Sequence, residues 1–341
     1  MSRILMVTPA FKSQRGNSIT VARFFKGLAG RGYDIDILAL DDSGWQQQLD
    51  LYTSEHSYSI VHGFHAMHSS IVTEHPRISK TPMLLTATGT DINFDMTGHN
   101  RQRVLQTLLK AERIVVFNPD MSRRIINADP GLKSRITVIP QGVDLPAGPA
   151  FTRKQFCLSE SDTVFIMPSG LRPVKNIDLA LEGLEKARAS NPALKLLIAG
   201  AAIDGAYAEH IQSRIRPLAW AVYLGEVPHG EIGGIMRIAD VVLSTSIAEG
   251  QPQAVLEAMS LGRPCILSAV EGNLGIIEDG VHGCYIRTSS ELADAALLLM
   301  NDPLLRQKLG SAAMKLVNER YNVKNEIEAY AALYEELKSY C

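Results

Sequence analysis

Cysteine is scarce in this chain, and its few copies are scattered. The four cysteines are Cys157, Cys265, Cys284 and Cys341, and no two have the two-residue spacing of a zinc site or a redox pair. A chain of 341 residues can build its cores without a disulfide framework. These features favour a reducing, cytoplasmic location.

Long apolar runs and an excess of either charge are missing too. No uncharged apolar run is long enough to span a bilayer. The first apolar stretch is short and is broken by Pro9, Lys12 and Arg15, which does not fit a signal peptide. The formal net charge of −2 lacks the basic excess of nucleic-acid binders, so we expect no nucleic-acid partner.

A peripheral membrane contact is a lower-ranked alternative. Residues 23–26 (Arg-Phe-Phe-Lys), together with Arg101, Arg103 and Lys110, could form a basic and apolar surface. Such residues more often form an ordinary helix exterior. The oligomeric state is left open.

The pattern along the chain indicates an α/β fold. Short apolar runs alternate with amphipathic segments of helical length, such as 18–29 and 177–189. The expected strands are 4–7, 35–40, 83–86, 114–117, 164–167, 194–199, 241–244 and 265–268. This alternation predicts parallel sheets with helices on both faces.

A break near residues 139–151 divides the pattern into two halves. Pro140, Gly142, Pro146, Gly148 and Pro149 crowd into this stretch, which is typical of a linker. We predict a first domain at 1–150, a second at 151–320 and, at 321–341, a helix that packs back on the first domain. Two doubly wound halves predict a cleft between them, with ligands beyond the carboxyl ends of the strands.

Two carboxylates follow a strand of the second half. Glu249 lies in a loop with Gly250, and Pro252 suits the first position of a helix that Gly262 ends. Glu257 lies on that helix, and a carboxylate suits paired sugar hydroxyls because it accepts several hydrogen bonds. Two solvated carboxylates flanking a helix are the alternative.

This segment, from Glu249 through seven residues to Glu257, resembles the signature of glycosyltransferase family 4, whose members have the GT-B fold and retain anomeric configuration. The resemblance is strongest from Gly170 to Gly283. It implies that Glu249 lies by the donor sugar and that Glu257 binds the donor ribose. The chain looks like a compact branch near the glycosyltransferase 1 domain-containing proteins of animals and, more distantly, the bacterial selenosugar synthases.

A basic pair follows the first strand of the second half. Arg172 and Lys175 suit a diphosphate through bidentate and point-charge contacts. The family places its arginine one position earlier and its lysine one position later, so the loop is more compact here. Ordinary surface charge is the alternative.

Three glycine segments complete the predicted donor site. Gly272 and Asn273 resemble the family's phosphate loop, where a missing side chain lets backbone N–H groups approach the ligand. Gly225 and Val227 resemble the segment beside the nucleobase. Gly250 permits the turn after Glu249.

The first half supplies further candidates at its own strand ends. Gly16 and Asn17 open the first helix, and a helix N-terminus suits an anion. The segment is not a G-x-G-x-x-G fingerprint, which argues against a nicotinamide enzyme. The family loop at this position approaches the donor phosphates.

His62, His65 and His68 are spaced by three residues after another strand. No acidic or cysteine partner accompanies them locally, so we expect no metal. Family resemblance favours His65 as a residue near the acceptor.

Gly89, Thr90 and Asp91 follow the strand at 83–86. Many family members have histidine-rich sequence here, facing the donor phosphate and the acceptor. The resemblance implies that Asp91 is a catalytic candidate. Because this chain lacks the histidine-rich sequence, the identity of the acceptor is left open.

The resulting hypothesis is hexosyl transfer from a UDP-sugar to an unidentified acceptor, without a cofactor. Arg172 and Lys175 would stabilise the leaving diphosphate in place of a metal, and a hinge near Pro140–Pro149 would close the cleft. The alternatives are a nucleotide-sugar epimerase or hydrolase on the same fold, and a non-catalytic protein that binds a nucleotide sugar.

Overall fold

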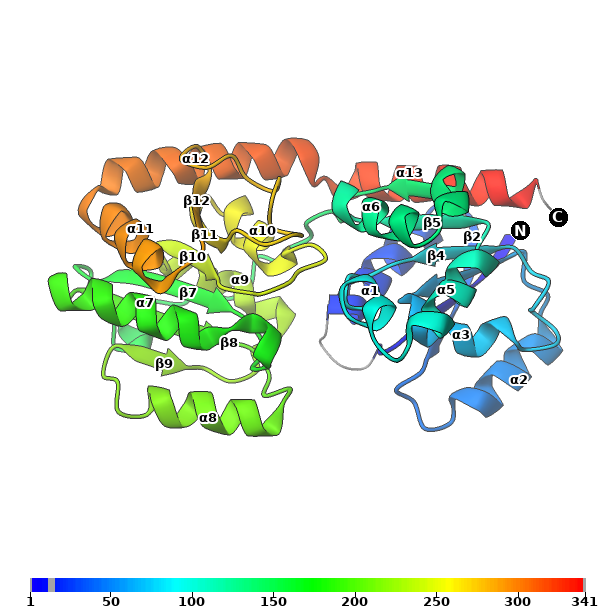
Figure 1. The fold of residues 1–341 in the computed structure, drawn as a ribbon, viewed down its shortest axis with the longest axis horizontal. Coiled ribbons are helices and arrows are strands. Elements are labelled where there is room, and N and C mark those ends of the chain that lie inside the picture. Colours follow the sequence, from blue (N-terminus) through cyan, green and yellow to red (C-terminus); the bar gives the residue numbers. More distant parts are fainter. Residues whose placement is uncertain (1, 12–15, 340–341) are drawn as a thin grey trace. The chain divides into compact units, whose positions relative to one another are not determined.

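The chain forms two compact domains, each built on one sheet. The computed structural model describes residues 2–11 and 16–339, and the side chains of residues 16 and 17 are outside that description. Domain 1 comprises Met1–Gly142 and Asn322–Cys341, and domain 2 comprises Val143–Tyr321 (Figure 1). The chain therefore passes from one domain to the other twice.

Domain 1 contains a six-stranded parallel sheet. Its strands lie in the order β2-β1-β3-β4-β5-β6. They span Ser2–Thr8 (β1), Tyr33–Ala39 (β2), Ile60–Phe64 (β3), Met83–Thr86 (β4), Arg113–Val116 (β5) and Ile136–Val138 (β6). Because β3 returns to the other side of β1, the strand order reverses between β1 and β3.

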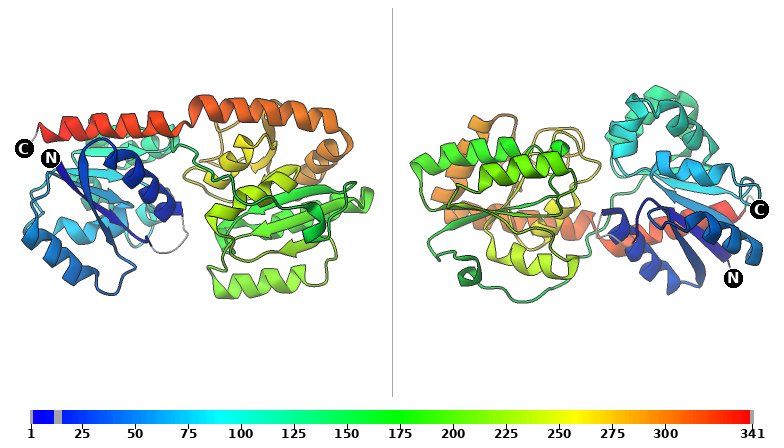
Figure 2. Two further views of the ribbon diagram at one scale, coloured as in Figure 1. Left: turned by 180° about the vertical axis from the view of Figure 1, so that it is seen from behind. Right: turned by 90° about the horizontal axis from the view of Figure 1, so that it is seen from below.

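Helices cover both faces of this sheet (Figure 2). They are α1 (Gly16–Ala29), α2 (Trp45–Glu55), α3 (Ala66–Thr73), α4 (Thr90–Asn93), α5 (Arg101–Lys110), α6 (Pro119–Ala128) and α13 (Val323–Lys338), with 3-10 turns η1 (Asp95–Thr97) and η2 (Pro130–Arg135). Apolar residues of α1 and α13 share one core with β1, β3, β4 and β5. Helices α2, α3, α5 and α6 contribute to the cores on the other face.

A buried ion pair fastens α13 to α1. Arg23 donates from Nε and Nη2 to the two carboxylate oxygens of Glu326, both at 2.9 Å. Both side chains are almost fully buried, and burial raises the pKa of Glu326 while Arg23 opposes that rise. Phe24 is also fully buried. Arg23 and Phe24 therefore belong to the core and do not contribute to the basic and apolar surface that was the lower-ranked alternative.

Domain 2 repeats the architecture with strands in the order β12-β11-β10-β7-β8-β9, all parallel. The strands are β7 (Thr163–Pro168), β8 (Leu194–Ala199), β9 (Ala221–Tyr223), β10 (Val241–Ser244), β11 (Cys265–Ser268) and β12 (Gly283–Ile286). The helices are α7 (Ile177–Ser190), α8 (Gly205–Ile215), α9 (His229–Ile238), α10 (Gln253–Ser260), α11 (Ser289–Asn301) and α12 (Pro303–Arg320), with turns η3 (Arg153–Phe156) and η4 (Pro173–Lys175). Helices α7, α8 and α11 pack on one face of the sheet, and α9, α10 and α12 pack on the other.

The predicted α/β class with two doubly wound parallel sheets is confirmed. The chain continues without regular structure after β6, as the proline and glycine content indicated. Its later part is packed rather than free, because a Cβ at Gly233 would lie 2.5 Å from the Pro146 carbonyl oxygen and one at Gly234 only 2.2 Å from that of Pro149. The two glycines of α9 thus let residues 146–149 lie directly on the helix.

Within the residues that the structure describes, no helix is both long enough and apolar enough to cross a membrane.

Candidate active site

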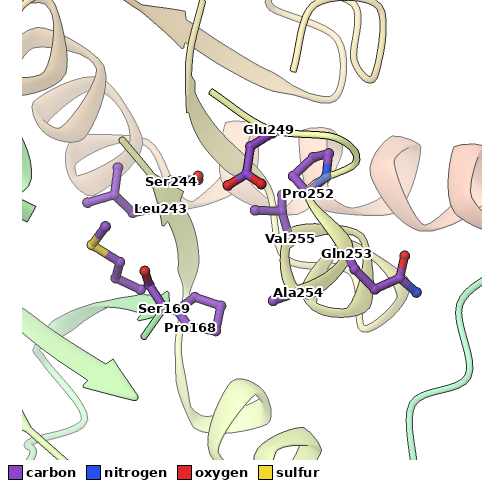
Figure 3. Close-up of a pocket in the computed structure, with 10 residues that line it drawn as sticks. Pro168, Ser169, Leu243, Ser244, Glu249, Pro252, Gln253, Ala254 and Val255 are labelled. Atoms are coloured by element: carbon purple, nitrogen blue, oxygen red, sulfur yellow. The ribbon is translucent and has the colours of Figure 1, made fainter. Parts of the chain in front are cut away.

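A pocket lies at the point in domain 2 where the strand order reverses. The first strand β7 pairs with β8 on one side and with β10 on the other, so the chain leaves it in both directions. Loops diverge at such a point and leave a crevice beyond the carboxyl ends of the strands. The pocket is lined by Met167, Pro168 and Ser169 at the end of β7, Leu243 and Ser244 at the end of β10, and Glu249, Pro252, Gln253, Ala254 and Val255 (Figure 3).

Glu249 is the carboxylate of this pocket and is held by two donors. Lys175 Nζ lies 2.6 Å from Oε1, and the Ser246 hydroxyl donates to the same oxygen at 2.6 Å. The Lys175 and Glu249 side chains are 17% and 12% exposed, so water screens this pair only partly. In Figure 3 the Glu249 carboxylate points toward the middle of the lining residues, whereas Gln253 extends away from it. The structure thus brings together two predicted residues that are distant in sequence.

Hydrogen bonds between the two loops fix this geometry. The Thr245 hydroxyl donates to the carbonyl oxygens of Lys175 and Asn176 at 3.1 and 2.9 Å, and the Ile247 amide donates to Val174 at 2.9 Å. Asn176 has a positive φ of 47°, a backbone conformation that asparagine tolerates better than most residues. The lysine loop after β7 and the glutamate loop after β10 are therefore joined by three hydrogen bonds.

Arg172 precedes η4 in the same loop and is half-buried. Within residues 2–11 and 16–339, its guanidinium has no hydrogen-bond or ion-pair partner, and its Nε is buried. A buried donor without an acceptor costs free energy. A planar cation in this state suits a ligand that brings oxygen acceptors, such as a phosphate.

Glu257 lies on α10 and is 5% exposed. His229, the first residue of α9, places Nε2 3.1 Å from Oε1 of Glu257. Pro252 directly precedes α10 rather than occupying its first position, and Gly262 ends the helix with φ of 73°.

The loop at residues 271–275 rests directly on the glutamate loop. Gly272 has φ of 91°, and a Cβ there would lie 2.0 Å from the carbonyl oxygen of Glu249. Only glycine permits this approach. Gly250, adjacent to Glu249, is buried.

Asn273 holds this loop from the inside. Its side chain is fully buried and donates to the Ser268 carbonyl oxygen at 3.0 Å, and its own carbonyl accepts from the Tyr285 hydroxyl at 2.7 Å. Its amide donates to Val270. These bonds fix the loop, whereas the buried Oδ1 of Asn273 has no partner among the described residues, so a donor contact by Asn273 stays a prediction.

The predicted nucleobase segment connects β9 to α9. Gly225 has φ of 77°, and its carbonyl oxygen accepts from the Gly200 amide at 2.8 Å. Val227 is partly buried against the core beneath α9 and α10. These contacts position the segment on the same side of the sheet as Glu257.

Domain 1 has its own strand-order reversal, and His65 lies there, directly after β3. It is 5% exposed, and its Nε2 lies 3.0 Å from the Thr90 hydroxyl and 3.7 Å from a carboxylate oxygen of Asp95. Its backbone has φ of 75°, which is strained for a histidine, and its buried Nδ1 has no partner among the described residues. Strain of this kind clusters at functional sites, so His65 stays a candidate.

Asp91 has a structural role instead of the predicted catalytic one. It is fully buried and accepts hydrogen bonds from the amides of Ala66 (2.8 Å), Thr88 (3.1 Å), Gly89 (2.8 Å) and Ile92 (3.1 Å). These bonds tie the loop after β4 to the start of α3. The predicted role does not fit because both carboxylate oxygens are already hydrogen-bonded to backbone amides. Gly89 supplies the required φ of 114°.

His62 was expected after the strand, but it lies inside β3. Its ring nitrogens lie 2.6 Å from the Tyr334 hydroxyl and 2.8 Å from the Thr86 hydroxyl. Complete burial lowers its pKa to about 3. Burial and the neighbouring His65 lower the pKa of His68 as well. Among the described residues, no group of three or more His, Cys, Asp or Glu side chains could hold a metal ion.

The first helix begins at Gly16, two residues earlier than predicted. The Ser18 hydroxyl donates to the Ala10 carbonyl oxygen at 3.1 Å. The side chains of Gly16 and Asn17, and all of Arg15, lie outside the described residues.

Comparison with solved structures defines the class. The whole chain superposes on sucrose-phosphate synthase of Thermosynechococcus elongatus with a TM-score of 0.84 and 18% identity, covering 100% of both chains. HepE of Anabaena, in complex with UDP and glucose, gives a TM-score of 0.82 and 18% identity, covering 98% of this chain and all of that one. At this identity the likeness shows the fold, and the fold is GT-B.

Sequence comparison then gives the activity. Residues 150–316 match the model of the family described as glycosyl transferases group 1. Glycosyltransferase 1 domain-containing protein 1 of Xenopus tropicalis is 25% identical over 72% of this chain and 73% of its own length. The D-inositol 3-phosphate glycosyltransferase of Geodermatophilus obscurus is 29% identical over 69% of this chain and 55% of its own length. These comparisons support a glycosyltransferase, with the similarity to the group 1 domain at residues 150–316.

Two functional positions escaped the sequence-based prediction. Ser246 holds Glu249, and its place just beyond a buried strand was a usable signal. His229 contacts Glu257 from the first residue of another helix. Nothing in the sequence indicates that His229 and Glu257 are in contact.

Proposed function

We propose that the protein transfers a hexose from a UDP-sugar to an acceptor with retention of anomeric configuration. Domain 2 would bind the donor. The solved relative HepE has been crystallised with UDP-glucose, at 18% identity to this chain, and this favours a uridine nucleotide. First-domain candidates for the acceptor side are His65 and Thr90, which are hydrogen-bonded to each other.

The observation that carries this proposal is the pairing of Glu249, which lines the pocket of domain 2, with Lys175, whose loop also carries Arg172. Glu249 is held by Lys175 and Ser246 and would lie beside the donor sugar. Lys175 has three N–H donors, so it can contact Glu249 and a phosphate oxygen together. Arg172, without a protein partner in the described part of the chain, would take the diphosphate.

These roles supply the charge that the reaction needs. Cleavage of the glycosidic bond to the diphosphate develops negative charge on the leaving oxygen. Preorganised cations at that position stabilise the transition state more than the ground state. The proposal assigns this work to Arg172 and Lys175 instead of a metal ion, so transfer should persist in EDTA.

Donor class is tested first by thermal unfolding with UDP-, GDP- and ADP-linked hexoses. A ligand at 100 times its Kd stabilises the native state by about 2.7 kcal/mol. We expect a rise in Tm with UDP-sugars only. Equal shifts with all three bases, or none, would contradict the uridine assignment.

Catalytic roles are tested with Lys175→Ala and with the matched control Lys186→Ala. Lys186 is an exposed lysine that donates hydrogen bonds to Ser289 and Ser290. Loss of Lys175 should lower transfer or donor hydrolysis at least tenfold, or about 1.4 kcal/mol of barrier. The control should keep wild-type rates. If both variants match the wild type, the diphosphate role is wrong.

Product analysis separates the remaining functions. NMR of the product should show the anomeric configuration of the donor. An altered sugar without any acceptor would indicate an epimerase. Tight UDP-sugar binding without turnover, across a broad acceptor panel, would indicate a binding protein.

A further inference from the structure

The contact between His229 and Glu257 joins two helices beneath the predicted nucleotide site. Nε2 of His229 lies 3.1 Å from Oε1 of Glu257, and the two side chains are 20% and 6% exposed. Since a carboxylate only accepts hydrogen bonds, the imidazole must carry the proton on Nε2. His229 therefore donates to Glu257.

The second carboxylate oxygen of Glu257 has no hydrogen bond within the described part of the chain. Glu257 lies beyond the first turn of α10, so the helix N-terminus does little to offset its charge. A carboxylate this deeply buried is costly unless it is hydrogen-bonded. One oxygen is thus engaged by protein, and the other is open to a ligand donor.

The packing of α9 against α10 positions the His229 imidazole beside Glu257. Ile232 and Met236 of α9 share a core with Leu256 and Met259 of α10. On its other side α9 is contacted by residues 146–149, which lie directly on its glycines. His229 therefore meets Glu257 in an orientation that the domain core determines.

We infer that His229 is a positioning residue for nucleotide recognition. It holds Oε1 of Glu257, so that the remaining oxygen faces a ribose hydroxyl of the donor. This inference rests on the proposed function, because Glu257 is assigned to the ribose there. It goes further by making the recognition of ribose depend on a residue that does not touch the nucleotide.

The test compares UDP with 2′,3′-dideoxy-UDP by isothermal titration calorimetry. The proteins are the wild type, His229→Ala, His229→Gln, Glu257→Ala and the control His210→Ala. His210 also contacts a carboxylate of domain 2, that of Asp178 at 2.8 Å, but neither residue lines the pocket. Glutamine can present an amide N–H where Nε2 lies, and alanine cannot.

We expect wild type to bind UDP about tenfold more tightly than the dideoxy compound. His229→Ala should weaken UDP binding about tenfold and leave dideoxy-UDP binding unchanged. His229→Gln should restore most of the discrimination, and His210→Ala should keep all of it. A merely structural role would lower the affinity for both nucleotides equally.

Two further results would also overturn the inference, and they are distinguishable. If Glu257→Ala abolishes the discrimination and both His229 variants keep it, His229 does not position the carboxylate, and the proposed function stands. If wild type and Glu257→Ala both bind the two nucleotides equally, the ribose role of Glu257 fails as well. Thermal denaturation of each variant verifies that it is folded.

Discussion

Replacing Gly272 by alanine should disable the donor site while changing stability only moderately. The residue has φ of 91°, and the added Cβ would lie 2.0 Å from the carbonyl oxygen of Glu249. Left-handed backbone costs a non-glycine residue about 1–2 kcal/mol. Because the atom it meets is backbone, the clash is relieved only when one loop moves by about 1 Å. A displacement of that size at a catalytic group can cost about a hundredfold in rate.

The matched control is Gly280→Ala. Gly280 has φ of 72° in the same domain, but a Cβ there meets nothing within 4 Å. Both variants should lose about 1–2 kcal/mol to backbone strain. Only Gly272→Ala should also lose about a hundredfold in sugar transfer. The chain has two tryptophans, Trp45 in domain 1 and Trp220 in domain 2, so urea unfolding of domain 2 can be followed in a Trp45→Phe background.

Equal activity of the two glycine variants would refute this reasoning. It would mean that the loop at residues 271–275 can move away from the glutamate loop without changing the activity of the pocket. A loss of transfer in both variants, in proportion to their stability, would instead attribute the effect to unfolding.

Two further predictions concern domain 1, followed by its own tryptophan in a Trp220→Phe background. Asp91→Ala should lower the unfolding free energy by about 3 kcal/mol or more, because four backbone donors lose their acceptor. Asp129→Ala, which removes one cap hydrogen bond from the Gly131 amide, should cost about 1 kcal/mol, and equal losses would contradict the structural role. In the wild type, His62 takes up a proton below pH 6.5 in the unfolded state but only near pH 3 in the folded state. The stability of the wild type therefore falls by about 1.4 kcal/mol per pH unit as the pH drops through this window, and His62→Gln should flatten this dependence. An unchanged slope in that variant, or the same flattening in the exposed His99→Gln, would argue against buried neutral His62.

Much of the fold was predictable because its strands are buried on both faces. The stretch at residues 194–199 is almost wholly apolar and was placed correctly, and so was the strand at 241–244. The short strands Ile136–Val138 and Gly283–Ile286 lie at sheet edges and are partly exposed, so no continuous apolar run marks them.

Site prediction failed where a side chain's direction mattered. Asp91 and Glu249 both follow a buried strand, yet one carboxylate turns back on its own backbone and the other lines the pocket. Sequence offers no local difference that separates these outcomes. His62 and His65 differ only in that the strand ends between them, and strand ends are the least predictable part of an element.

The position of α13 has a consequence for the order in which the chain acquires structure during synthesis. Domain 2 is one continuous segment, whereas domain 1 needs residues on both sides of it. Tyr330 and Tyr334, fully buried against β3 and α1, are translated after all of domain 2. Domain 2 can therefore complete its core first, while one face of the domain 1 sheet is covered only by α1 until α13 leaves the ribosome. A chaperone that protects apolar surface would find its substrate in the half of the protein that is made first.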